Sequence, residues 1–150
     1  MCCRFIFLFL LSTTALASEI KPFTSDGCSA FPEGTFTQQS LWSNCCFRHD
    51  LAYWKGGTEK QKDIADYDLE SCVTNVGEPH IAKLMLAGVK VGGSPFLNTP
   101  FRWGYGWPYG DGYKVLSRSD KLQVIKKLSN FKAIIDDQIK QISLEQSDAE

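Results

Sequence analysis

The side chains with the widest chemical use in this chain are gathered in one short stretch, Cys45-Cys46-Phe47-Arg48-His49-Asp50-Leu51-Ala52-Tyr53. Side chains four positions apart lie on one face of a helix. If the stretch is helical, His49 shares a face with Cys45 and Tyr53. By the same spacing, Asp50 shares a face with Cys46. Such a helix would offer a base, a carboxylate that can hold a metal, and two cysteines that tie other segments to it.

The sequence around this stretch predicts two helices joined by a tight turn. The first runs from about Ser40 to Lys55 and is ended by Gly56-Gly57. Thr58 and Gln61 form a capping-box pattern that begins the second helix. Its apolar side chains recur at three- and four-residue spacing, at Ala65, Leu69, Cys72, Val73 and Val76. A turn this short favours two antiparallel helices.

The rest of the chain also favours helices over strands. Pro79 opens a short third helix that runs through about Lys90. Residues 95–113 form an irregular loop rich in glycine, proline and aromatic residues. Ser119 or Asp120 then caps a long helix, whose apolar side is expected to pack in the core and consists of Leu122, Ile125, Leu128, Ile135, Ile139 and Ile142. The predicted fold is therefore mainly α.

The N-terminal segment has the three parts of a secretory signal peptide. Arg4 gives a positive start, residues 5–11 are a short apolar run, and residues 15–17 form a small-x-small cleavage site. We therefore expect residues 1–18 to be removed and residues 19–150 to form one secreted domain. Of the 16 basic residues only Arg4 lies in the leader, so 15 remain against 17 acidic residues, a net charge of about −2. Such a chain is not expected to bind nucleic acid, which needs a basic surface.

Four cysteines remain after the leader, Cys28, Cys45, Cys46 and Cys72. An even number in an exported chain predicts disulfides, and four cysteines allow three pairings. A bond between the adjacent Cys45 and Cys46 would strain a helix, so it is discounted. The other two pairings stay open on this argument.

One of these pairings would bring a second carboxylate to the histidine. Suppose that Cys45 is bonded to Cys72 across the antiparallel pair. His49 then lies about 6 Å along the first helix from Cys45, and Asp66 lies about 9 Å back along the second helix from Cys72. Both side chains then lie at roughly the same level, so Asp66 could hydrogen-bond one imidazole nitrogen and leave the other as a base. Tyr53, one turn beyond His49, could hold that carboxylate through its hydroxyl group.

The same pairing would leave Cys46 to Cys28. That bond would bring the turn around Cys28 close to Asp50. A carboxylate that faces a turn rich in backbone carbonyls is typical of a calcium site in an exported protein.

These residues resemble the secreted calcium-dependent phospholipases A2. The family signature Cys-Cys-x-x-His-Asp-x-x-Tyr is similar to residues 45–53, and the family's second aspartate lies six residues before the cysteine that bonds to the first of the pair, as Asp66 does before Cys72. The resemblance covers residues 27–72. It implies the disulfides Cys28–Cys46 and Cys45–Cys72 and a disulfide-linked antiparallel helix pair of phospholipase A2 type. Additional C-terminal helices and the aromatic loop would follow this pair.

The resemblance also implies an activity, hydrolysis of the sn-2 ester of a glycerophospholipid. His49 would be the general base, Asp66 would orient it and Tyr53 would brace Asp66. Calcium would be held by Asp50 and by the carbonyls of Gly27, Ser29 and Phe31, with the Ser29 N–H on the oxyanion side. The loop after Cys28 departs from the family pattern, because it reads Ser29-Ala30-Phe31-Pro32-Glu33 where the family has glycines.

That departure favours two alternatives to a phospholipase. One is a non-catalytic secreted protein that keeps the scaffold and binds a lipid or a protein. The other is an esterase that acts on a different acyl-lipid. Zinc is not expected, because the chain has only two histidines and the second, His80, should lie in solvent at a helix start.

Four aromatic residues in the loop are candidates for contact with a phospholipid membrane or lipid aggregate. They are Trp103, Tyr105, Trp107 and Tyr109, separated by Gly104, Gly106 and Pro108. Rings of this kind are at home at the membrane interface, and the near-neutral charge leaves aromatic contact as the means of docking. The alternative is that these rings pack over the long C-terminal helix and complete the core. The sequence leaves the oligomeric state open.

Overall fold

The computed structural model describes residues 18–147, so the predicted leader lies outside the described residues except for Ser18. Within residues 18–147 the chain has four helices and no strand. The mainly α prediction is confirmed at this level. The helices are α1 Ser43–Lys55, α2 Glu59–Asn75, α3 Pro79–Gly92 and α4 Arg118–Ser147.

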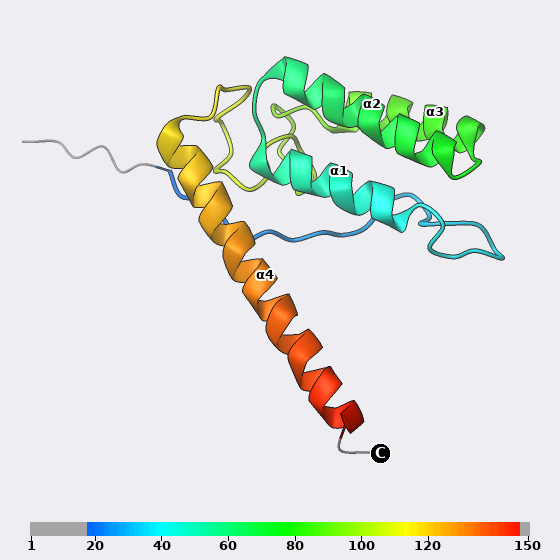
Figure 1. The fold of residues 1–150 in the computed structure, drawn as a ribbon. Coiled ribbons are helices and arrows are strands. Elements are labelled where there is room, and N and C mark those ends of the chain that lie inside the picture. The colour runs from blue at the N-terminus through cyan, green and yellow to red at the C-terminus, as the bar shows by residue number, and fades with distance from the viewer. Residues whose placement is uncertain (1–17, 148–150) are drawn as a thin grey trace, which may run out of the picture.

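The first two helices lie antiparallel, with a disulfide near one end and the glycine turn at the other (Figure 1). Gly56 and Gly57 have φ of 65° and 145°, which only glycine adopts without strain. The predicted capping box is present, because the Thr58 hydroxyl accepts the Gln61 N–H while the Gln61 side chain accepts the Thr58 N–H. The turn and the cap therefore set the direction of α2.

The first helix begins at Ser43, a few residues later than predicted. Residues 40–42 form turns, and Trp42 occupies the N-cap position without a side-chain cap. Its indole N–H instead donates to the Pro32 carbonyl at 2.6 Å. The buried ring joins the core between α1, α2 and α3, which consists of Trp42, Cys45, Cys46, Leu69, Val73, Ala82 and Met85.

The aromatic loop covers the C-terminal end of α1. The last carbonyls of a helix have no partner within it. The Trp107 indole donates to the Lys55 carbonyl at 2.8 Å, and the Trp103 indole donates to the Gly57 carbonyl at 2.9 Å. The backbones of the loop and of α1 also meet, since the Gly104 N–H donates to the Tyr53 carbonyl at 2.7 Å and a Cβ added to Gly56 would lie only 2.8 Å from the Gly104 Cα. The glycines of the loop permit this close packing.

The prediction that the aromatic residues face a lipid surface is therefore wrong for Trp103 and Trp107, which are each 1% exposed. Their N–H groups find buried partners at the end of α1, and this outweighs their use at an interface. Tyr105 is half-buried and donates to the Thr24 and Asp50 carbonyls. Tyr109 alone of the four is well exposed, at 54%.

The long C-terminal helix begins earlier than predicted and packs over only part of its length. Ser117 is the capping residue, because its hydroxyl accepts the Asp120 N–H while Asp120 accepts the Ser117 N–H. Val124 and Leu128 pack into the cluster that contains Trp107, and Phe131 packs edge to face on Phe23. Beyond this point α4 projects away from the other helices (Figure 1). The predicted core role is wrong for most of the apolar side, since 44–59% of each of these residues is exposed: Leu122, Ile125, Ile135, Ile139 and Ile142.

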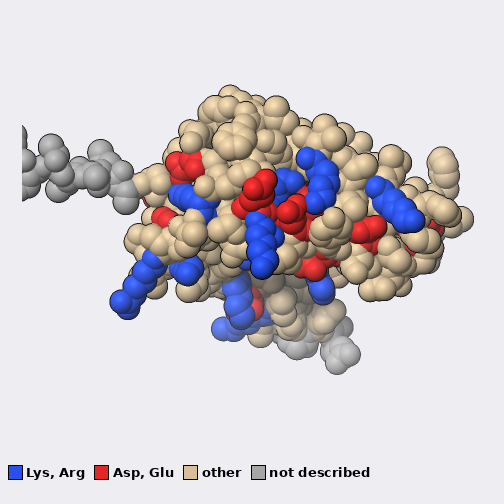
Figure 2. All heavy atoms as spheres, turned by 90° about the horizontal axis from the view of Figure 1, so that it is seen from above, with Lys and Arg blue, Asp and Glu red and all other residues tan. Residues whose placement is uncertain are grey.

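Two surface properties bear on function. None of the helices in residues 18–147 is long and apolar enough to cross a membrane. On the face shown in Figure 2, acidic and basic side chains are interspersed, so this face has no large patch of one sign.

Candidate functional site

The antiparallel pair brings His49 and Tyr53 of α1 against Asp66 of α2. His49 Nε2 lies 3.3 Å from Asp66 Oδ1, and the Tyr53 hydroxyl donates to the same oxygen at 2.6 Å. Asp66 is fully buried, while the His49 side chain is 9% exposed. The His49 and Tyr53 rings also lie against each other, with centroids 4.1 Å apart. The three residues that the sequence predicted to meet do lie together.

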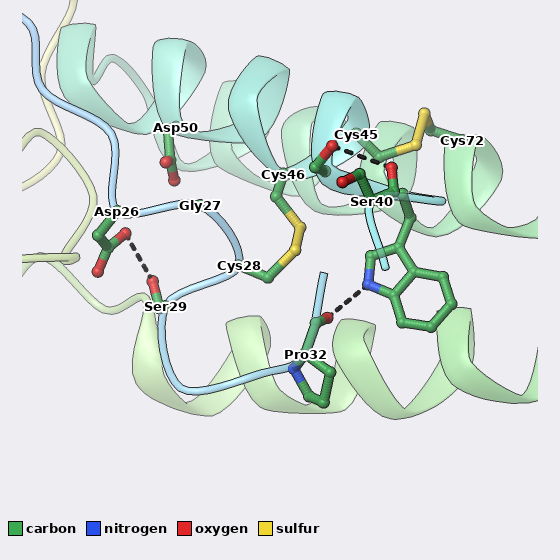
Figure 3. The surroundings of a disulfide bond; sticks show 12 residues. Asp26, Gly27, Cys28, Ser29, Pro32, Ser40, Cys45, Cys46, Asp50 and Cys72 are labelled. Atoms are coloured by element: carbon green, nitrogen blue, oxygen red, sulfur yellow. Dashed lines mark hydrogen bonds between the residues drawn. A yellow bond between two sulfur atoms is a disulfide. The ribbon is translucent and has the colours of Figure 1, made fainter. Parts of the chain in front are cut away.

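The disulfides explain this register. Cys45 is bonded to Cys72, and Cys28 is bonded to Cys46. Both bonds are those that the resemblance implied. The first fixes the level of α1 against α2, and the second holds the Cys28 loop against α1, as Figure 3 shows.

Lys62 is a member of the site that the sequence reading missed. Its Nζ lies 2.8 Å from Asp66 Oδ2 and donates to the Val89 carbonyl at 3.3 Å. The residue is 4% exposed, which is rare for lysine. The only signal in the sequence is the four-residue spacing from Lys62 to Asp66 on α2, and such pairs usually lie in solvent.

Asp66 therefore receives three donors on its two oxygens. Burial alone would raise the pKa of Asp66, but hydrogen bonds from His49, Lys62 and Tyr53 outweigh it and hold this pKa below its ordinary value. Burial and the bond to Asp66 raise the pKa of Tyr53 far above the ordinary range of a tyrosine. Asp66 is thus ionised and Tyr53 is a fixed donor at neutral pH. The carboxylate can hold the His49 ring in place by its Nε2 and leave Nδ1 free to act as a base.

Asp50 lies on the neighbouring face of α1 and extends towards the loop that carries Gly27 (Figure 3). It is 7% exposed and accepts the Ser25 hydroxyl at 2.6 Å. Burial raises the pKa of Asp50 to about 6, with smaller opposing effects of the Ser25 hydrogen bond. Among the described residues no lysine or arginine forms an ion pair with it. When such a buried carboxylate is ionised and has no cationic partner, its negative charge is poorly solvated.

The loop around Cys28 keeps a backbone suited to glycine despite its sequence. Gly27 has φ of 72°, and Ser29 has φ of 56°, a conformation uncommon for residues other than glycine. The Ser29 hydroxyl donates to Asp26, and the Phe31 N–H donates to the Cys28 carbonyl. The loop thus adopts a tight turn beside Asp50 even though Ser29 stands where glycine was expected.

Asp50 and the loop around Cys28 could bind a hard cation only if backbone carbonyls supply most of the ligands. In the described part of the chain, no group of three or more His, Cys, Asp or Glu side chains could hold a metal. A cation here would therefore depend on the Asp50 carboxylate and on backbone carbonyls. Gly27, Ser29 and Phe31 line the same cavity as Asp50, which is consistent with such a ligand set for calcium.

That cavity has a volume of about 400 Å³ and a polar and an apolar side. His49 and Asp50 lie on the polar side. The apolar wall comes mainly from α3, which supplies Leu84, Met85 and Val89, and from Phe101. Leu84 and Phe101 are 59% and 39% exposed, so they lie where the cavity meets solvent. The sequence reading placed no residue of α3 in the site, because the packing of α3 beside α2 is a long-range contact.

Comparisons of the chain with models of protein families, with curated proteins and with solved structures give no match.

Proposed function

We propose that the chain is a phospholipase A2-like carboxylic ester hydrolase that cleaves the sn-2 ester of glycerophospholipids and depends on calcium. One observation carries the proposal. His49 is held by the buried Asp66 and opens, beside the desolvated Asp50, into a cavity with an apolar wall. A base, a site for positive charge and a space for an acyl chain therefore meet in one place.

The chemistry follows from the orientation of His49. Its Nδ1 takes a proton from a water molecule, and the water oxygen bonds to the ester carbonyl carbon. The bond from that carbon to the sn-2 oxygen then breaks, and the proton on His49 passes to the leaving alcohol. The products are a fatty acid and a lysophospholipid. Asp66 keeps the ring aligned and stabilises the imidazolium that forms.

Negative charge on the carbonyl oxygen must be stabilised during this step. The Ser29 N–H is the donor that the resemblance places on that side. Calcium, when bound by Asp50 with the carbonyls of Gly27, Ser29 and Phe31, would supply positive charge to the substrate phosphate and to the oxyanion. The buried carboxylate of Asp50 and its lack of a cationic partner support this assignment.

The leader pattern and the two disulfides support a secreted protein that meets lipid outside the cytosol. The substrate is then a phospholipid membrane surface or lipid aggregate. The arrangement of α1 and α2 around Cys45–Cys72 supports a helix pair of phospholipase A2 type.

One contact favours the rival function of a non-catalytic lipid- or protein-binding protein. The Ser25 hydroxyl donates to Asp50, so the carboxylate already has a partner in the place where calcium would bind. In such a protein the cavity would hold a lipid chain without hydrolysis. An esterase that acts on another acyl-lipid would keep the base and change only the fit of the substrate.

Release of fatty acid from mixed phospholipid vesicles separates these functions. The mature chain should release fatty acid with calcium and lose this activity with a chelator. The His49→Gln variant should be inactive, while the control His80→Gln, at an exposed position on α3, should keep full activity. Release that a chelator does not affect would reject the calcium role. Absence of release from any phospholipid would favour the binding protein, or another ester if a wider substrate panel is cleaved.

A further inference from the structure

The exposed side of α4 carries a pattern that the proposed function does not use. Six residues follow each other at alternating intervals of three and four, namely Ile125, Leu128, Lys132, Ile135, Ile139 and Ile142. This spacing is that of a coiled-coil seam, in which such positions face a partner helix. Four of the five apolar members are 44–59% exposed, and Leu128 is half-buried because it also packs against the cluster that contains Trp107.

The structure of α4 calls for a partner along this seam. Its second half projects away from the other helices (Figure 1). An isolated helical segment of about 15 residues is marginal in water, and most helical stability comes from packing of an apolar face. We infer that this seam pairs with α4 of a second copy of the chain, in antiparallel orientation.

The order of the seam residues supports an antiparallel pair. If the two helices cross midway between residues 133 and 134, Ile125 of one copy lies opposite Ile142 of the other. Leu128 then lies opposite Ile139, and Lys132 opposite Ile135. Every apolar member therefore meets an apolar partner or the stem of Lys132, and the long stem of a lysine can cover apolar surface while its charge reaches solvent.

The charges of α4 support the same orientation. Its first half, Arg118–Lys132, carries five basic residues and one acidic residue, whereas its second half has Asp136, Asp137 and Glu145 against Lys140. An antiparallel pair places each basic half against an acidic half, and a parallel pair places like against like. Lys132 already pairs with Asp136 in its own helix, and in the dimer the Asp136 of the second copy lies close to it as well.

A lipid surface is a less suitable occupant of this seam. Helices that lie on membranes usually carry basic residues along the polar face. The outer half of α4 has more acidic than basic residues, and a lipid surface would not account for the matched order of the seam. The pairing does not depend on the proposed hydrolase activity.

Light scattering or sedimentation of the mature chain over a wide range of concentration tests the pairing. The wild type should have twice the monomer mass. Ile135→Asp should raise the dimer dissociation constant by about a hundredfold or more, since a symmetrical dimer would bury the new charge twice. The matched control is Ile134→Asp, since Ile134 is 62% exposed, adjacent and off the seam, so this variant should stay dimeric. Circular dichroism should show wild-type helix content for Ile134→Asp and, for Ile135→Asp, a loss no larger than the outer half of α4, which the pairing stabilises.

Cysteine cross-linking tests the orientation. Under oxidation, chains with Lys121→Cys should bond to chains with Gln146→Cys, because these positions lie opposite each other in the antiparallel register. A wild type that is monomeric at every concentration, or an equal effect of the two aspartate variants, would overturn the inference. Self-bonding of Gln146→Cys would overturn the orientation. A monomer that loses vesicle binding on Ile135→Asp would assign the seam to lipid.

Discussion

The carboxylate of Asp66 is the centre of the site at the scale of single residues. It is fully buried and accepts bonds from His49, Tyr53 and Lys62. Because two of these donors are held by other contacts as well, the carboxylate has little freedom to rotate. Tyr53 also reaches the Val89 carbonyl, as does Lys62. The position of His49 is therefore set by a network that includes α3.

We predict that Lys62→Met weakens both stability and catalysis. Loss of one partner of a buried ion pair leaves Asp66 without its charge partner and typically costs about 3–5 kcal/mol. The surface pair of Lys90 with Asp63, with side chains 34% and 51% exposed, is the control, and Lys90→Met should cost less than about 1 kcal/mol. Denaturant unfolding measures the free energy of unfolding of both variants, and fatty-acid release measures their activity. Equal losses would show that Lys62 has no special role.

Asp50 should reduce the stability of the protein when calcium is absent. Its pKa is raised in the fold to about 6 by burial, so its protonated form stabilises the fold at low pH, and this stability is lost as the pH rises through about 6. In chelator at neutral pH, Asp50→Asn should therefore have a higher melting temperature than the wild type. Below about pH 4, where an unfolded aspartate is also protonated, the difference should vanish.

Calcium should reverse this order. Ligand binding to the folded state alone raises the melting temperature, so the wild type should gain stability with calcium while Asp50→Asn gains little. Thermal unfolding with calcium and with chelator, across pH, measures all of these effects. An equal calcium-induced shift in the two proteins would place the metal elsewhere, with Asp26 and Glu33 as the nearest candidates.

At the scale of elements, the helix boundaries follow local signals and were largely predictable. Gly56-Gly57, the Thr58 cap and Pro79 act on their immediate neighbours, and they begin or end helices where expected. The start of α4 lies earlier than predicted, although the sequence carries the signal: Ser117 has Asp120 three residues later, which is a capping-box pattern, whereas Ser119 has Leu122 at that position. The sequence left the aromatic loop open between a lipid-facing and a buried arrangement, because its burial depends on carbonyls at the end of α1 that are distant in the sequence.

The burial of Trp107 gives a prediction at this scale. Its ring lies in the core cluster that also contains Val124 of α4, and its N–H donates to the Lys55 carbonyl, so Trp107→Ala should destabilise the protein by about 3–5 kcal/mol. Tyr109→Ala, two residues along and 54% exposed, should cost under about 1 kcal/mol. Denaturant unfolding compares the two. A small loss at Trp107 would mean that the loop does not hold α1 and α4 together.

At the scale of the whole molecule, the residues of the candidate site were predictable from the sequence and the residues that surround them were not. A motif of fixed spacing identified His49, Asp50 and Tyr53, and the disulfide register added Asp66. The apolar wall of α3 and the buried Lys62 are set by the packing of α3 against α2, which no local pattern encodes. The exposed seam of α4 was expected in the core because periodicity shows that a face is apolar without showing what covers it.

Because Trp103 and Trp107 are buried, the surface expected to contact lipid is the rim of the cavity, formed by Leu84 and Phe101. Leu84 and Phe101 both line the cavity and are exposed, so they are placed to contact lipid while a substrate enters. We predict that Leu84→Ser and Phe101→Ser lower fatty-acid release from vesicles by about tenfold or more when combined, because each removes apolar contact with the bilayer. Hydrolysis of a soluble short-chain ester should change much less.

The control for this prediction is Val91→Ser. Val91 lies on α3 and is 78% exposed, but it does not line the cavity. If general surface hydrophobicity brings the protein to lipid, Val91→Ser should reduce vesicle hydrolysis as much as Leu84→Ser. If instead the cavity rim brings the protein to lipid, only Leu84→Ser and Phe101→Ser should lose vesicle binding, which co-sedimentation measures. The melting temperatures of these two variants and of Val91→Ser should stay close to that of the wild type. Equal activity of all variants on vesicles would show that docking occurs on another face.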